Sequence, residues 1–258
     1  CMSPIVVADV LERELFGEAT VICASATLTT AGTFDHIAND IGCRQYDQII
    51  GASPFDTEHC AALIVPSDMP DPRDPKFTEA VAAHVKQAID IADGRVLGLF
   101  TSYKNLNAAH ARCGGNGHRV LRQGDAPRTQ LVNEFRRDVR SSLLGTDSFW
   151  EGVDVPGEAL SVVVIDRLPF TSPDNPIMDA ITERDPDGWF MNYAVPESII
   201  RFKQGFGRLI RTRTDRGVVV CLDARLRTKA YGRLFLRSLP RVPVYDTMES
   251  MRKVLEVK

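Results

Sequence analysis

The sequence P-E-S-I-I-R-F-K-Q-G-F-G-R-L-I-R, residues 196–211, is the stretch around which the rest of the chain is organised. Pro196 suits the first turn of a helix, where its missing N–H is not needed. Gln204, Arg208 and Arg211 then follow at spacings of four and three residues, which is one face of a helix. Because a guanidinium group donates in a planar fork that matches phosphate oxygens, two in line suit a polyphosphate.

Two glycines interrupt this expected helix, Gly205 and Gly207. Each lowers helix stability by about 1 kcal/mol relative to alanine, so they indicate that something packs too closely there for a side chain. The alternative is a solvated basic face, which is what arginines at helical spacing usually form.

Length and composition are those of a globular α/β protein. The chain has 258 residues, of which 44% are hydrophobic and 25% are charged. No apolar run approaches the roughly 20 residues that span a membrane, and the first residues do not resemble a secretory signal. No linker or repeat divides the sequence. We therefore expect a cytoplasmic protein with one domain.

Cysteine and histidine spacing gives no metal-binding pattern. The six cysteines lie far apart without a C-x-x-C pair, and the five histidines are equally scattered. We expect reduced thiols that mostly fill the core, and no metal site.

Charge is distributed unevenly along the chain. The net charge is −3, yet residues 1–100 hold 6 Lys and Arg against 15 Asp and Glu, whereas residues 196–241 hold 12 against 3. A basic segment in a near-neutral chain favours local contact with phosphates, although a basic surface offset by an acidic one stays open.

Short apolar runs alternate with helical patterns, which predicts βαβ units and a mostly parallel sheet. The expected strands are residues 20–24, 61–65, 95–100, 119–122, 142–144, 159–165 and 218–223. The expected helices are residues 6–16, 32–41, 78–91, the segment from the Thr101–Lys104 strand end to about residue 113, 129–137 and 196–211, with shorter helical pieces after residue 231.

Three of these strands end in polar sequences, after Cys23, Phe100 and Leu144. Because the carboxyl ends of parallel strands share one edge of the sheet, we expect these loops and the 196–211 helix to form one site. For the hydroxyls after Cys23, capping of the next helix is the favoured alternative.

Four segments carry a resemblance to a known family. They are S-A-T-L at 25–28, F-T-S-Y at 100–103, the run from Gly145 to Gly157, and Q-G-F-G-R-L-I-R at 204–211. In order and spacing they resemble the third to sixth motifs of DinG-type and XPD-type superfamily 2 DNA helicases, with bacterial DinG as the best match.

The first half of that family's motor has no counterpart in this sequence. There is no G-x-x-x-x-G-K-[ST] phosphate loop, no acidic D-E-A-H-like pair and no set of four iron–sulfur cysteines. The resemblance therefore implies that residues 1–258 are the second RecA-like motor domain, a three-layer α/β/α sandwich. ATP with Mg²⁺, and any iron–sulfur cluster, would be held mainly by the absent first motor domain.

The resemblance also implies roles for residues near the nucleotide. Arg208 and Arg211 would stabilise charge on the transferring phosphoryl group, with Arg211 as the arginine finger and Gln204 positioning water or phosphate. The cofactor-binding residues would be Glu151, Gly152, Asp154, Ser25 and Thr27. For Asp154, capping of the turn before Val155 is an open alternative.

Single-stranded DNA and the first motor domain are the implied partners, with a role in DNA repair. The implied DNA-binding residues are Thr101, Ser102, Tyr103, Gly145, Thr146 and Trp150. Trp150 is equally well explained as a core residue.

Two other functions stay open. A self-contained Rossmann-like enzyme would need G-x-G-x-x-G after its first strand, where this chain has S-A-T-L-T-T. A non-catalytic nucleic-acid-binding module would rely on the basic segment 196–241 alone.

Overall fold

The computed structural model describes residues 6–114, 117–150, 155, 157–172, 174–210, 212 and 215–256. They form two compact units whose segments alternate along the chain. The smaller unit comprises Cys1–Ala52, Pro169–Lys203 and Leu234–Ser238, and the larger one comprises Ser53–Leu168, Gln204–Arg233 and Leu239–Lys258. The single domain expected for residues 1–258 stays a prediction.

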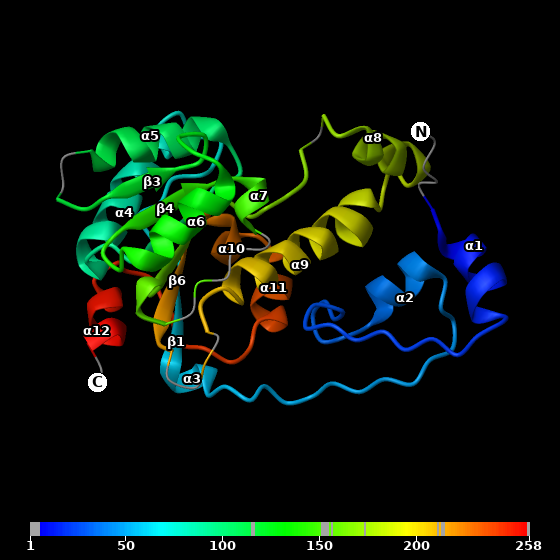
Figure 1. Ribbon diagram of the computed structural model, residues 1–258. Coiled ribbons are helices and arrows are strands. Elements are labelled where there is room, and N and C mark those ends of the chain that lie inside the picture. Colours follow the sequence, from blue (N-terminus) through cyan, green and yellow to red (C-terminus); the bar gives the residue numbers. More distant parts are fainter. Residues whose placement is uncertain are drawn as a thin grey trace. The chain divides into compact units, whose positions relative to one another are not determined.

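The larger unit is built on a seven-stranded sheet in which every pair is parallel, in the order β3-β4-β2-β5-β6-β1-β7 (Figure 1). The strands are β1 (Ala61–Ile64), β2 (Val96–Leu99), β3 (Val120–Arg122), β4 (Ser142–Gly145), β5 (Val162–Ile165), β6 (Gly217–Cys221) and β7 (Val244–Tyr245). The predicted α/β class with a parallel sheet is confirmed.

Most of these strands are short, continuous apolar runs because both faces of the sheet are covered. One face carries α4 (Phe77–Ala92), α5 (Tyr103–Cys113) and α12 (Ser250–Glu256), whose side chains share a core cluster with alternate strand residues. Elsewhere α6 (Arg128–Arg137) packs on β3 and β4, and α7 (Asp147–Trp150) packs on β2 and β4.

Three short helices complete the larger unit. They are α3 (Thr57–Cys60), the 3₁₀ helix η2 (Gly157–Ala159) and α10 (Arg225–Thr228).

The smaller unit is mainly helical. Its elements are α1 (Ala8–Leu11), the π-helix η1 (Glu12–Phe16), α2 (Asp35–Ile41), α8 (Pro176–Arg184), the π-helix η3 (Phe190–Ala194), most of α9 (Val195–Phe206) and most of α11 (Gly232–Ser238). Aromatic rings hold these pieces together: Phe170 stacks on Phe190 at 5.5 Å, and Phe202 meets Phe235 edge-on at 5.6 Å.

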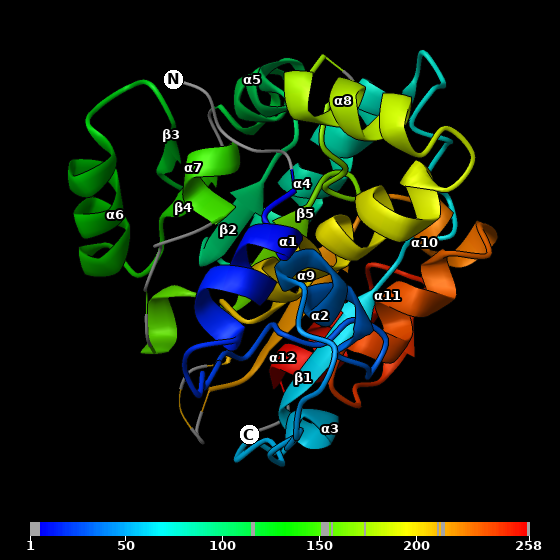
Figure 2. The same cartoon turned by 90° about the vertical axis from the view of Figure 1, so that its right-hand side faces the viewer.

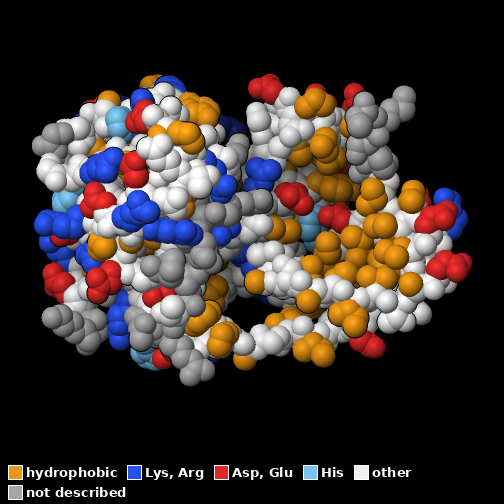
Figure 3. Space-filling view, in the orientation of Figure 1, with side chains coloured by type: hydrophobic (Ala, Val, Ile, Leu, Met, Phe, Trp, Pro, Cys, Tyr) orange, Lys and Arg blue, Asp and Glu red, His pale blue; other side chains and the backbone are white. Residues whose placement is uncertain are grey.

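The strand expected at residues 20–24 is wrong. None of the seven described strands includes it, and the side chain of Ile22 is 90% exposed. A strand needs neighbouring strands to satisfy its backbone, and this segment belongs to the smaller unit, whereas the seven described strands belong to the larger one. Exposed hydrophobic side chains also occur nearby at Val21, Ile49 and Ile50, and Figure 3 shows such side chains gathered on the surface of the N-terminal segment.

The helix expected at residues 196–211 is only partly correct. Helical structure begins before Pro196, as the π-helix η3 runs directly into α9. A widened turn there accommodates a proline, which cannot donate to the preceding turn. At its other end α9 stops at Phe206, so Gly207 lies in a turn rather than inside the helix.

No described helix is long and apolar enough to cross a membrane. The five described cysteines are free, and of these Cys113 and Cys221 are buried in the core. Burial raises the pKa of the Cys113 thiol to about 11, so at neutral pH it stays a protonated, unreactive group.

Candidate functional site

The carboxyl ends of β2 and β5 form the topological switch point of the sheet. These strands are neighbours, and Figure 2 shows β3 and β4 on one side of β2. The chain leaves β2 towards β3 on that side and leaves β5 towards β6 on the other. Open parallel sheets bind ligands at such a point, because the two departing loops separate and leave space between them.

Asp166 organises this switch point. It is fully buried directly after β5, and its carboxylate accepts hydrogen bonds from the Thr101 backbone N–H at 2.8 Å and the Asn105 side-chain amide at 2.8 Å. The Thr101 hydroxyl also lies within bonding distance, at 3.4 Å. Burial raises the pKa of Asp166 to about 6, although these donors oppose the shift by stabilising the charged form. The turn after β2 is therefore fixed to the end of β5.

A second polar network joins the loops after β2, β3 and β4. The Gln123 side chain donates to the Tyr103 hydroxyl at 2.8 Å, and its carbonyl oxygen accepts from the Thr146 backbone N–H at 2.6 Å and from the Thr146 hydroxyl at 3.0 Å. The Tyr103 ring itself is 55% exposed. Two of the three strand ends predicted to form one site, those after Phe100 and Leu144, thus meet on one surface, together with the end of β3. The predicted end after Cys23 is not one of them, because residues 20–24 form no described strand.

Ser102 and Gly145 have local structural roles at this edge. The Ser102 hydroxyl accepts from the Asn105 backbone N–H and caps α5. A Cβ atom on Gly145 would lie 2.5 Å from the ring of Phe149, so the close packing of α7 on β4 requires glycine there.

Trp150 belongs to the core, which is one of the two interpretations left open by the sequence. Its side chain is 4% exposed, and its indole N–H points to the Phe100 carbonyl oxygen at 3.4 Å. A Cβ atom on Gly205 would meet the Trp150 ring at 3.1 Å and the Leu99 side chain at 3.3 Å. The close packing expected at Gly205 is therefore present.

Arg208 lies beside α7, in the turn that follows α9. Its Nε atom donates to the Trp150 carbonyl oxygen at 3.1 Å, and its side chain is half-buried. Gln204 is half-buried in the last turn of α9. Since α9 has ended, Gln204 and Arg208 do not share one helical face, contrary to the spacing argument.

The other predicted residues belong to the smaller unit or lie outside the described chain. Arg211, Glu151, Gly152 and Asp154 lie outside the described residues. Ser25 and Thr27 lie in the smaller unit, where the Ser25 hydroxyl accepts from the Thr27 backbone N–H at 3.2 Å.

These two hydroxyls do not cap the helix that follows them. Helix α2 begins after Phe34 and has no side-chain cap, so the capping alternative for Ser25 and Thr27 is wrong.

Sequence reasoning missed Asp166, Asn105 and Gln123. Asp166 and Gln123 each directly follow a buried strand, so the rule that selected Thr101 also selects them. Asn105 carries no such signal, because its role depends on how α5 is placed against β5.

Comparisons with known proteins identify the family of this chain. Residues 85–242 match the family model described as the helicase C-terminal domain. The protein named ATP-dependent DNA helicase YoaA of Haemophilus influenzae is 39% identical over 247 residues, covering 93% of this chain and 38% of that protein. ATP-dependent helicase DinG of Mycobacterium tuberculosis is 40% identical over 255 residues, covering 95% of this chain and 38% of that protein.

A more distant relative, named 3'-5' exonuclease DinG, comes from Bacillus subtilis and is 32% identical over 262 residues, covering 96% of this chain and 28% of that protein. The chain thus spans 38% or less of the length of these relatives.

Among solved structures, a chain titled XPD helicase aligns with a TM-score of 0.56 at 18% identity, covering 72% of this chain and 35% of that one. This likeness supports the fold alone. Since the family model matches more than half of the sequence, the chain belongs to the helicase C-terminal domain family, and its resemblance to DinG-type helicases is confirmed.

Proposed function

We propose that this chain is the second motor domain of an ATP-dependent DNA helicase, and that it completes an ATP site held mainly by a first motor domain. Family membership and relatives named as ATP-dependent DNA helicases support the proposal. The chain's lack of a phosphate-binding loop makes it depend on another domain for Mg²⁺ and the phosphates.

The observation that carries the proposal is the fixed position of Arg208. A hydrogen bond from Nε to the Trp150 carbonyl oxygen sets the plane of the guanidinium group. A preorganised guanidinium lowers the barrier to phosphoryl transfer, because it need not reorient as charge develops on the phosphate. Arg211 is proposed as the finger that contacts the γ-phosphate, and Gln204 as the group that orients the attacking water.

The nucleotide would also be contacted by other predicted residues. Glu151, Gly152 and Asp154 are proposed to line the nucleotide site, and Ser25 and Thr27 to couple it to DNA.

Single-stranded DNA is proposed to bind along the loops after β2 and β4. Thr101, Ser102, Gly145 and Thr146 would offer hydroxyl and backbone N–H groups to phosphates, which position a strand without reading its sequence. The exposed ring of Tyr103 would stack on a base. Trp150 is not part of this track, because it is buried in the core.

ATP turnover by the full-length enzyme tests the arginine roles. Arg211→Ala should lower the DNA-stimulated rate by about 10³-fold or more, while single-strand affinity stays within about twofold. Arg216→Ala is the matched control, because Arg216 bonds the His59 carbonyl oxygen at a different place in the larger unit. Turnover in Arg211→Ala within tenfold of the control variant would refute the finger assignment.

The purified chain alone tests whether ATP hydrolysis requires the first motor domain. It should hydrolyse no ATP above background, and it should bind single strands weakly, with an affinity that falls steeply as salt rises. Steady-state turnover by the chain alone would contradict the proposal. Binding as tight as that of the full-length enzyme would favour a non-catalytic binding module instead.

A further inference from the structure

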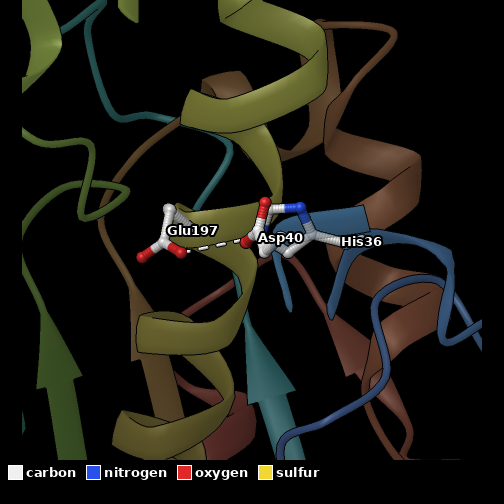
Figure 4. A group of neighbouring side chains, drawn as sticks. All are labelled: His36, Asp40 and Glu197. Carbon is white, nitrogen blue, oxygen red and sulfur yellow. Dashed lines mark ion pairs between the residues drawn. The ribbon is translucent and has the colours of Figure 1, made fainter. Parts of the chain in front are cut away.

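Three titratable side chains of the smaller unit converge at a place that the proposed helicase function does not use. His36 and Asp40 lie one turn apart on α2, and Glu197 lies on the first turns of α9. Figure 4 shows the imidazole and the two carboxyl groups brought together from these two helices. One ligand atom of each residue lies within 4.8 Å of the other two.

His36 is buried and its inward nitrogen has no hydrogen-bond partner. The side chain is 8% exposed, and its Nε2 atom lies 3.3 Å from Asp40 Oδ2 and 3.6 Å from Glu197 Oε1. A charged N–H···O bond is usually about 2.7–2.9 Å long, so both separations are too long for a good one.

The same separations suit a shared cation. With metal–ligand distances of about 2.0–2.2 Å and tetrahedral angles, neighbouring ligand atoms lie about 3.3–3.6 Å apart. The Nε2 atom of His36 has these separations from both carboxylates. The ligand oxygens of Asp40 and Glu197 lie within 4.8 Å of each other, and rotation of these partly exposed carboxylates would bring them to the separation that a shared ion needs.

We propose that His36, Asp40 and Glu197 form a binding site for a divalent transition-metal ion of the Zn²⁺ class. One imidazole nitrogen and two carboxylate oxygens are ligands that zinc accepts, whereas Mg²⁺ and Ca²⁺ favour oxygen alone. The carboxylates of Asp40 and Glu197 are 37% and 50% exposed, so water completes the coordination from the open side.

This site departs from the expectation of no metal, which was based on spacing along the sequence. His36 and Asp40 supply only two ligands at helical spacing, and the third comes from a segment far away in the chain. A bound ion would link α2 to α9 within the smaller unit, and it would stabilise that unit in proportion to its occupancy.

Metal titration of the chelator-treated full-length protein tests the site. Isothermal titration with Zn²⁺ should reveal one site whose affinity falls at least tenfold in His36→Gln. Co²⁺ should give visible d–d absorption that is lost in the same variant. His59→Gln is the control, because His59 also pairs with a carboxylate, Asp56, at 2.9 Å, but it lies on the exposed surface and belongs to no group of three possible ligands among the described residues.

A second variant separates loss of metal binding from loss of folding. Asp40→Asn keeps the shape of the side chain and should also weaken Zn²⁺ binding, and circular dichroism in metal-free buffer checks that each variant is folded. Zn²⁺ affinity unchanged in both folded variants would overturn the proposal. So would the absence of Zn²⁺ binding in the wild type, which would leave the cluster as an ion pair between histidine and two carboxylates.

Discussion

At the scale of single residues, Tyr103 tests the proposed DNA track, because it is the exposed aromatic ring in the strand-end network. Tyr103→Ala in the full-length enzyme should weaken single-strand binding by about 1–3 kcal/mol, which is the usual value of one stacked base. Tyr103→Phe keeps the ring and should stay close to wild type, although it loses the bond to Gln123. Fluorescence anisotropy with a labelled oligonucleotide measures both.

The same loss of affinity in Tyr103→Phe as in Tyr103→Ala would contradict stacking. It would show instead that the hydroxyl bond to Gln123 matters. Tyr245→Ala, on β7 at the other edge of the sheet, serves as the control and should bind like wild type.

Asp166 should make folding stability depend on pH. Its native pKa of about 6 lies above the ordinary aspartate value of 3.8, so the folded chain holds this proton more tightly than the unfolded chain. The resulting stabilisation is fully present below about pH 4 and is lost as pH rises through about 6, by up to about 3 kcal/mol. Urea unfolding of wild type and Asp166→Asn across this range measures the difference.

Asparagine has no titratable group, so the contribution of the Asp166 proton is absent from the Asp166→Asn variant. The difference in unfolding free energy between the two proteins should therefore change with pH. Asp74→Asn, at an exposed position, should not alter the profile of the wild type. The free energy of unfolding of wild type could instead differ from that of Asp166→Asn by a constant amount from pH 4 to pH 6.5. That result would mean that the Asp166 carboxylate stays charged in the folded protein.

The residues of the candidate site were predictable where a polar side chain directly follows an apolar strand in the sequence. Thr101, Tyr103 and Thr146 lie at strand ends, and the structure joins them through Gln123 and Asp166. The prediction that Gln204 and Arg208 share one helical face was wrong, because α9 ends at Phe206 and Arg208 lies in the following turn. The His36 cluster depends on a contact between distant segments that no local pattern contains.

At the scale of elements, the last turn of α9 depends on the absence of a side chain at Gly205. Valine there would push into Trp150, Leu99 and Ile165, which an added Cβ atom meets at 3.1, 3.3 and 3.4 Å. We expect Gly205→Val to lower the free energy of unfolding by about 1–3 kcal/mol through overpacking. It should also slow ATP turnover, because Trp150 anchors Arg208.

Gly51→Val is the matched control for the denaturation midpoint, since a Cβ atom there meets nothing within 4 Å. Equal denaturation midpoints for Gly205→Val and Gly51→Val would show that the side chains around Gly205 move aside without loss of stability.

Strands were predictable from the sequence where every residue of the segment is buried and therefore apolar. β1, β2, β5 and β6 are continuous apolar runs, and they form strands at the expected places. Residues 20–24 have the same local signature, but none of the described strands pairs with them, and pairing is a property of the whole sheet rather than of the segment. Helix α8 was missed because prolines and acidic residues surround it, although Asn175 caps it and Pro176 opens it.

At the scale of the whole molecule, the chain's last described helix closes the core of the larger unit. Met251 on α12 is fully buried among side chains of α4 and the sheet. Met251→Ala should therefore lower the free energy of unfolding by about 2–5 kcal/mol. Val244→Ala on the exposed edge strand β7 should change it by less than about 1 kcal/mol, and urea titration distinguishes the two. Similar midpoints for the two variants would show that α12 contributes little to the core.

The order of strands also has a consequence for how the chain is made. β1 pairs with β6 and β7, and β6 begins about 150 residues after β1 ends. At a synthesis rate of about 5–20 residues per second, a ribosome needs roughly 8–30 s to reach β6. Throughout that interval the apolar strand Ala-Ala-Leu-Ile has no partner in the sheet, so its unpaired backbone and apolar side chains are open to aggregation while the chain is being made.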